Sequence, residues 1–239
     1  MLKVLIVIPC FNEEDSIAST VEEVREKLAS NSDVIFEPIV INDASTDRSL
    51  SVVQNIGVNH IDLPVNLGIG GAVQSGYLYA QANDFDIAVQ LDGDGQHNPS
   101  YIKELIQPII SDDADVVIGS RFISKKGFQS TRLRRFGIKY FSWLNDVMVN
   151  VKILDTTSGF RAINRNVINT VCEYYPEKYP EPESIILYSF HSYRITEIPV
   201  EMRGRSGGKS SITGFKSLFY MFKVTVGILF LYIRLKSKR

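Results

Sequence analysis

The chain has 239 residues, 44% of them hydrophobic, which is enough for one substantial core. Its two cysteines, Cys10 and Cys172, exclude a disulfide framework and a cysteine-based metal site, and they predict a reducing, cytosolic environment. Residues 1–119 hold 5 basic and 19 acidic residues, whereas residues 120–239 hold 21 basic and 8 acidic residues. The acidic half therefore suits a cation, and the basic half suits phosphates or a membrane surface.

Strand and helix patterns alternate through the first half. The run at 2–8 is too short for a signal peptide and suits a strand buried on both faces. Further strands are predicted at 36–41, 60–63, 85–91 and 115–119, with helices at 12–30, after Asp47, at 68–82 and from Pro99. This predicts an α/β fold with a mostly parallel sheet covered by helices on both faces. Ligands bind such sheets beyond the carboxyl ends of the strands, so the polar clusters at 9–13, 42–47 and 92–96 should meet at one crevice.

The second half is less regular. Residues 133–149 have the pattern of an amphipathic helix, 155–161 that of a tight polar loop, 197–200 that of a short strand and 203–211 that of a loop. The final apolar stretch, 218–233, is shorter than the roughly 20 residues that span a bilayer. We expect either an interfacial, partly inserted helix with a basic tail, or a helix packed on the domain or in an oligomer. The predicted units are 1–212, with a donor half 1–119 and an acceptor half 120–212, and 213–239.

Asp92 and Asp94 follow the predicted strand 85–91. Oxygen ligands suit Mg²⁺ or Mn²⁺, which proteins usually hold with one or two carboxylates plus substrate phosphates. Gln96 or His97 could complete the coordination shell. Alone, the pattern also fits a solvated Asp-Gly turn. Asp43, which follows another predicted strand, favours a binding site.

The ordered set of motifs is similar to that of the family 2 glycosyltransferases, which have the GT-A fold. The matching stretches lie at 8–14, 42–47, 66–71, 92–96 and 119–121. The second half, at 155–161 and 205–210, resembles the polyprenyl-phosphate glycosyltransferase branch, which includes dolichyl-phosphate mannose synthase and bacterial undecaprenyl-phosphate sugar synthases.

The resemblance implies roles for particular residues. Nucleotide-sugar binding is implied for Pro9, Glu13, Asp43, Gly68, Asp92, Arg205 and Ser210. Mg²⁺ or Mn²⁺ binding is implied for Asp94, Gln96 and Asp92, and catalysis for Asp92, Asp94 and Arg205, with Arg205 and Ser210 closing over the diphosphate. Binding of the acceptor phosphate is implied for Arg121, Arg135, Arg132 and Ser158.

The implied reaction is inverting transfer of a monosaccharide to a polyprenyl (undecaprenyl) phosphate at the cytoplasmic face of the cell membrane. A UDP-sugar is favoured, with glucose or N-acetylglucosamine as the sugar. The implied partners include the membrane surface and either a small membrane protein or a second copy of the chain. Nucleic acid is not expected, because no RNA- or DNA-binding motif accompanies the basic run at 121–139.

Two other functions stay open from the sequence. A transferase that extends a saccharide would need a base, for which Glu183 is the candidate, although Glu183 also fits an acidic residue in the first turn of a helix after Pro182. A non-catalytic nucleotide-sugar or nucleic-acid binding module is the third hypothesis, and the complete set of Asp92, Asp94 and Arg205 argues against it.

Overall fold

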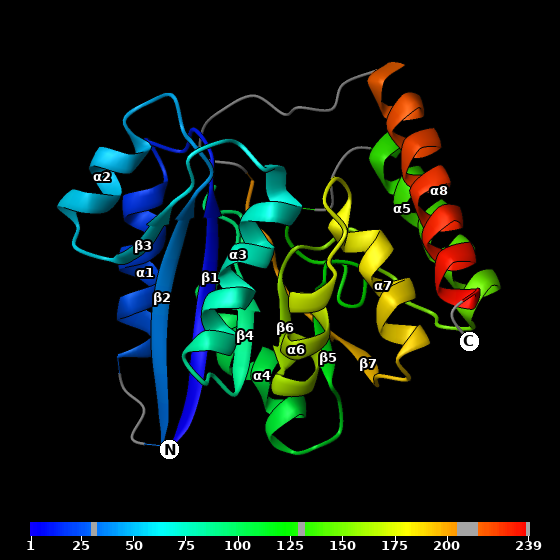
Figure 1. The fold of residues 1–239 in the computed structure, drawn as a ribbon, viewed down its shortest axis with the longest axis horizontal. Coiled ribbons are helices and arrows are strands. Elements are labelled where there is room, and N and C mark those ends of the chain that lie inside the picture. The colour runs from blue at the N-terminus through cyan, green and yellow to red at the C-terminus, as the bar shows by residue number, and fades with distance from the viewer. Residues whose placement is uncertain (30–32, 129–131, 205–214, 238–239) are drawn as a thin grey trace.

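The computed structural model describes residues 1–29, 33–128, 132–204 and 215–237. Seven strands form one sheet (Figure 1). Their spatial order is β3 (Asn59–Asp62), β2 (Val34–Asn42), β1 (Leu2–Cys10), β4 (Ile87–Gln90), β6 (Arg161–Asn164), β5 (Val116–Ser120) and β7 (Ile195–Pro199). Only β6 runs antiparallel to its neighbours β4 and β5, so the prediction of a mostly parallel α/β sheet is confirmed.

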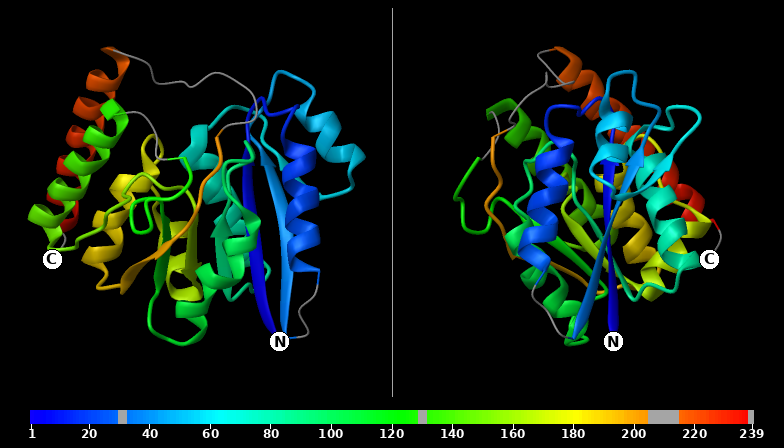
Figure 2. Two further views of the ribbon diagram at one scale, coloured as in Figure 1. Left: turned by 180° about the vertical axis from the view of Figure 1, so that it is seen from behind. Right: turned by 90° about the vertical axis from the view of Figure 1, so that its left-hand side faces the viewer.

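Helices cover both faces of the sheet, as Figure 2 shows from two sides. One face carries α1 (Ile17–Leu28), α2 (Ser49–Asn55) and α4 (Ile102–Ile110), and the other carries α3 (Gly68–Ala82), α6 (Arg165–Glu173) and α7 (Pro180–Phe190). Alternate residues of β1 enter the two cores, with Ile6 in one and Val7 in the other. This two-sided burial explains why β1 reads as a continuous apolar run.

Two further helices, α5 (Arg132–Val149) and α8 (Phe215–Lys236), lie side by side outside α7 (Figure 1). Their inner faces build a third, small apolar cluster with Ile186 of α7, which includes Phe141 of α5 and Val224 and Ile228 of α8. Within the described residues, no helix combines the length and the apolarity that crossing a bilayer requires. The division of the chain at residue 212 stays a prediction.

Glu183, in the first turn of α7, is buried against α8. Glu183 is 8% exposed. A Cβ atom at Gly227 of α8 would lie only 2.6 Å from the Oε1 atom of Glu183. Because Gly227 has no side chain, the carboxyl group of Glu183 fits against α8. Burial, with a smaller effect from the charge of Glu181, raises the pKa of Glu183 to about 7.

Replacing Glu183 by glutamine should change how stability depends on pH. The folded chain holds the carboxyl proton more tightly than the unfolded chain, so the stability it contributes is complete below pH 4.5 and is lost as the pH rises through about 7. Glu183→Gln cannot ionise, and its free energy of unfolding should exceed that of the wild type by up to about 3 kcal/mol at pH 8, with a much smaller gap at pH 4.5. Urea denaturation at the two pH values measures this.

The exposed Glu22 on α1 provides the control. Glu22→Gln should follow the wild-type dependence of stability on pH. Equal stability of the wild type and Glu183→Gln at pH 8 would contradict the assignment.

Candidate functional site

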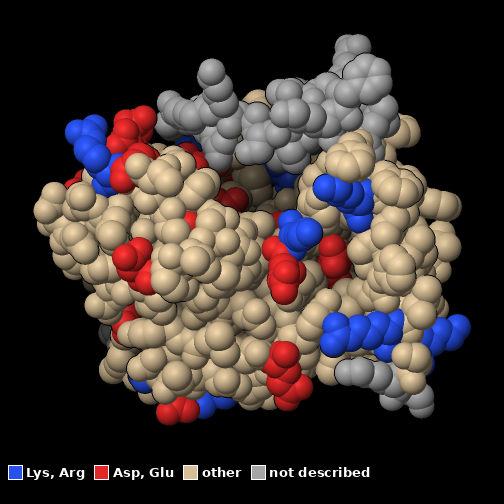
Figure 3. Space-filling model, turned by 45° about the horizontal axis from the view of Figure 1, so that its top comes forward, with Lys and Arg blue, Asp and Glu red and all other residues tan. Residues whose placement is uncertain are grey.

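The carboxyl ends of β1, β2 and β4 border one crevice, as the positions of the polar clusters predicted. Six of the residues predicted for the nucleotide sugar and the metal lie in its wall: Pro9, Glu13, Asp43, Gly68, Asp92 and Asp94. Figure 3 looks toward this end of the molecule and shows acidic side chains in a hollow. Arg205 and Ser210 lie outside the described residues.

Asp43 shapes the wall of the crevice through backbone contacts. Its Oδ1 accepts a hydrogen bond from the N–H of Leu67 at 2.6 Å, and its Oδ2 accepts one from the N–H of Gly68 at 2.9 Å. Gly68 has a φ of +76°, a conformation that glycine adopts without strain. Asp43 therefore fixes the start of α3, and both of its carboxylate oxygens are already hydrogen-bonded.

Asp92 and Asp94 belong to one ordered loop after β4. Asp92 has a side chain that is 35% exposed, and its Oδ1 lies 3.4 Å from the amide nitrogen of Gln90. Asp94 is buried, and its Oδ1 accepts a hydrogen bond from the N–H of Gln96 at 3.0 Å. The Nδ1 atom of His97 accepts the N–H of Asp92 at 3.0 Å, so this nitrogen is not free to act as a metal ligand.

The donor set of this loop fits a hard cation that shares its ligands with a substrate. No group of three or more His, Cys, Asp or Glu side chains able to hold a metal occurs within the described part of the chain. Two carboxylates at a crevice match Mg²⁺ or Mn²⁺, which proteins hold with one or two carboxylates and the phosphates of a nucleotide. The residues therefore fit a metal that binds together with a diphosphate, with Asp92 and Asp94 as the protein ligands.

Gly159, from the second half of the chain, lies next to the side chain of Asp92. A Cβ atom at this position would come within 2.8 Å of the Gln90 amide nitrogen and 3.1 Å of Asp92 Oδ1. A side chain at this position would therefore press on the Gln90 amide and the Asp92 carboxylate.

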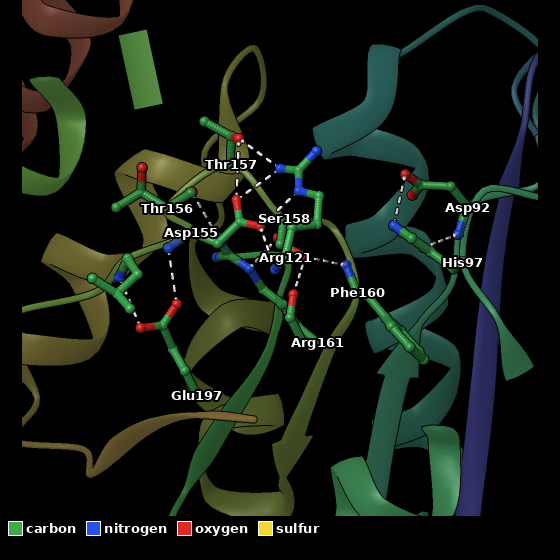
Figure 4. Close-up of polar contacts among 12 residues, drawn as sticks. Asp92, His97, Arg121, Asp155, Thr156, Thr157, Ser158, Phe160, Arg161 and Glu197 are labelled. Atoms are coloured by element: carbon green, nitrogen blue, oxygen red, sulfur yellow. Dashed lines mark hydrogen bonds and ion pairs between the residues drawn. The ribbon is translucent and has the colours of Figure 1, made fainter. Parts of the chain in front are cut away.

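The loop that carries Gly159 is held by a buried ion pair. Arg121, at the end of β5, donates two hydrogen bonds of 2.7 Å to the Asp155 carboxylate, and Asp155 is fully buried (Figure 4). The carboxylate of Glu197 on β7 accepts the N–H groups of Leu154 and Asp155 at 2.7 and 2.8 Å. Two strands thus fix the loop at 154–159.

The residues predicted for the acceptor phosphate do not all face one space. Arg121 is 9% exposed and its guanidinium binds Asp155, and Ser158 is 1% exposed and donates its hydroxyl to the carbonyl of Gly119 at 2.7 Å. Both side chains frame the loop, and in this structure Ser158 has no surface to offer a phosphate. Arg135 is exposed near the start of α5, and the side chain of Arg132 lies outside the described residues.

Two charged residues that the sequence did not point to, Arg161 and Glu181, interact with the loop at 154–159 and with Asp92. Arg161 is 1% exposed and donates to the carbonyls of Ser158 and Thr156 and to the hydroxyl of Ser184. Burial raises the pKa of Glu181, the positive charge of Arg161 lowers it, and the negative charge of Asp92 raises it. The two acids of α7 thus differ in their surroundings: Glu181 interacts electrostatically with Arg161 and Asp92, whereas Glu183 lies against α8.

Asp155→Asn should destabilise the protein strongly, because it leaves the charge of Arg121 buried without a counter-charge. Breaking a buried pair in this way costs about 3–5 kcal/mol. Asp112→Asn is the matched control, since Asp112 pairs with Arg194 at 2.6 Å but has a side chain that is 91% exposed. That change should cost less than about 1 kcal/mol. Urea denaturation compares them, and equal losses would refute the structural role of the buried pair.

Comparison with known proteins agrees with the fold. The family model described as "Glycosyl transferase family 2" matches residues 5–172. The UDP-N-acetylglucosamine–dolichyl-phosphate N-acetylglucosaminyltransferase of Methanococcus voltae is 28% identical, over 94% of this chain and 96% of the relative. The undecaprenyl-phosphate mannosyltransferase of Micrococcus luteus is 27% identical, over 71% of this chain and 70% of the relative.

A solved structure shows the same fold. Glucosyl-3-phosphoglycerate synthase from Mycobacterium tuberculosis, in complex with Mn²⁺, UDP-glucose and phosphoglyceric acid, superposes with a TM-score of 0.72 at 18% identity. The match covers 97% of this chain and 80% of that protein. With the family model matching more than half of its length, the chain belongs to glycosyl transferase family 2 and is a glycosyltransferase.

Proposed function

We propose that the protein transfers a hexose from a nucleotide sugar to a polyprenyl phosphate, with inversion at the anomeric carbon. The observation that carries the proposal is the crevice at the strand ends, which Asp92 and Asp94 line together with Pro9, Glu13 and Asp43. The activities named for the M. voltae and M. luteus relatives support a polyprenyl or dolichyl phosphate as the acceptor.

The donor side is proposed to work by charge stabilisation. A Mg²⁺ or Mn²⁺ ion held by Asp92 and Asp94, with Gln96 beside them, would stabilise the charge that the leaving nucleoside diphosphate gains. Arg205 and Ser210 are proposed to close over the diphosphate. Pro9, Glu13, Asp43 and Gly68 are proposed to line the nucleotide side.

The acceptor side needs little proton chemistry. A phosphomonoester has a second pKa of about 6, so its oxygens are mostly deprotonated at neutral pH. One of these oxygens bonds to the anomeric carbon while the bond from that carbon to the diphosphate oxygen breaks, and the electron pair leaves with the diphosphate. Arg135 and Arg132 are proposed to attract the acceptor phosphate, and Arg121 and Ser158 to shape the neighbouring loop.

The donor is proposed to be a UDP-sugar, with glucose or N-acetylglucosamine as the hexose. The M. voltae relative is named for UDP-N-acetylglucosamine, and the M. tuberculosis structure contains UDP-glucose and Mn²⁺. These names support UDP as the nucleotide and leave the sugar to experiment.

A second candidate function is the extension of a saccharide, which requires a base near the reacting centre. Glu183, the candidate base from the sequence, lies against Gly227 of α8. Glu181, also on α7, interacts electrostatically with Asp92, so we propose it as a second candidate base for this reaction. This observation favours testing Glu181 in place of Glu183.

The exposed faces of α5 and α8 are proposed to bind the membrane surface on the cytoplasmic side. They carry a set of large apolar side chains that are 43–70% exposed: Phe136, Trp143, Val147, Phe219, Phe222, Leu229, Phe230 and Ile233. Residues 215–236 contain no Asp or Glu, and Lys223 lies 4.4 Å from the centre of the Phe219 ring. An apolar face with basic neighbours favours anionic lipid.

The transfer reaction can be tested with a panel of UDP- and GDP-sugars, undecaprenyl phosphate and either metal, with the products identified by mass spectrometry. We expect one hexose on the lipid phosphate, and a loss of rate of roughly 100-fold or more in Asp94→Asn. Asp113→Asn, at an exposed position just after α4, should keep full activity.

The variant Glu181→Gln separates the two candidate functions. Glycolipid formation that survives in this variant supports the phosphate acceptor. A saccharide product that disappears with Glu181→Gln supports the second candidate and refutes the first.

Membrane binding can be read from Trp143, the single tryptophan of the chain, which is 58% exposed on the proposed face. Its fluorescence should shift to the blue with vesicles that contain phosphatidylglycerol, and less with phosphatidylcholine alone, because the basic side chains need anionic lipid. Phe230→Ser should weaken cosedimentation with these vesicles, whereas Ile110→Ser, 46% exposed on α4, should not. If vesicles bind without a blue shift, the membrane contact lies on another face of the protein. If Trp143 becomes buried by self-association in the absence of lipid, a second copy of the chain is favoured as the partner.

A further inference from the structure

His97 combines burial with a fixed arrangement of its two ring nitrogens. The residue is 4% exposed, and its Nδ1 lies 3.0 Å from the backbone nitrogen of Asp92. A backbone N–H can only donate, so Nδ1 accepts and carries no proton. The neutral ring therefore has its proton on Nε2, which lies 3.7 Å from Asp92 Oδ2 (Figure 4). One side chain thus contacts both the backbone and the carboxylate side of Asp92.

The orientation of the His97 ring is set by the second half of the chain. The ring stacks on Phe160, with the ring centres 5.0 Å apart and the planes 13° from parallel. Phe160 is fully buried, and its carbonyl accepts the N–H of Gly119 at 2.8 Å. The imidazole can neither turn nor move without disturbing this contact.

Asp92 is also confined on its other sides. The amide nitrogen of Gln90 lies 3.4 Å from Oδ1, and the backbone of Gly159 lies beneath both carboxylate oxygens. His97 Nε2 lies 3.7 Å from Oδ2. The part of the carboxylate that stays accessible is directed to the crevice, which Asp92 lines.

We propose that His97 is a positioning residue for the transfer reaction. Its Nδ1 fixes the backbone at Asp92, and its Nε2 lies 3.7 Å from the carboxylate, so that Asp92 faces the cation and the diphosphate in one orientation. The inference rests on the proposed function, since it assigns Asp92 to that complex. His97 acts through Asp92 and does not bind the metal itself, because Nδ1 is engaged and the ring is buried. Groups of this kind commonly change metal affinity by about 10–100-fold.

Three variants separate the parts of this arrangement. His97→Phe keeps a ring to stack on Phe160 but has no nitrogen. His97→Asn places an amide oxygen near the position of Nδ1, where it can accept the N–H of Asp92. His97→Gln places an amide nitrogen near the position of Nε2. His60→Phe, at an exposed position of β3, is the matched control.

The primary readout is binding of Mn²⁺ in the presence of UDP, followed by the electron paramagnetic resonance signal of free Mn²⁺, with thermal unfolding as a check on folding. We expect His97→Phe to bind Mn²⁺ at least about 10-fold more weakly than the wild type. His97→Asn should recover most of that loss, and His60→Phe should bind normally. Nitrogen-15 NMR of the unliganded wild type should show Nδ1 unprotonated, which tests the arrangement even if His97→Phe fails to fold.

The outcomes separate this inference from the proposed function. If the wild type binds Mn²⁺ with UDP and His97→Phe binds it equally well, the positioning role is refuted while the proposed function stands. A protonated Nδ1 in the wild type would refute it as well. If the wild type binds neither Mn²⁺ nor UDP, the proposed function fails and the inference falls with it.

Discussion

The ion pair between Arg121 and Asp155 is the interaction on which the site depends. Because the pair is buried, removing one of its two charges would leave the other buried without a partner, at a high cost in stability. The pair also fixes the loop that leads into β6. That loop brings Gly159 beneath Asp92 and Phe160 against His97. The acidic loop of the first half of the chain is therefore shaped by a basic residue of the second half.

The opposite charges of the two halves have a structural explanation. The acidic residues of the first half include those that follow β2 and β4, where Asp43, Asp92 and Asp94 line the crevice. The basic residues of the second half divide between the interior and the surface. Arg121 and Arg161 hold the loop beside the crevice from within, whereas Arg135 and Lys223 lie exposed on α5 and α8. Net charge alone would have hidden this arrangement.

Much of the fold and the donor side was predictable, because buried parallel strands read as apolar runs and their ends must meet at one edge. Three features were not. β6 has four residues and follows a predicted loop, and its antiparallel pairing with β4 is set by tertiary contacts. Asp155 is separated from Arg121 by 34 residues, so its pairing is invisible to local patterns. Glu181 and Glu183 are close in sequence, and only the packing of α8 reveals that Glu183 lies against Gly227.

The two edges of the sheet have a consequence for how molecules of this protein behave when they are concentrated. An exposed edge strand offers unpaired N–H and C=O groups to the edge of another molecule, and this is a common route to aggregation. Here one edge, β3, is only four residues long, and the other, β7, ends in Pro199, which has no N–H to donate. Copies crowded together can therefore remain separate folded molecules, without joining their sheets into fibres.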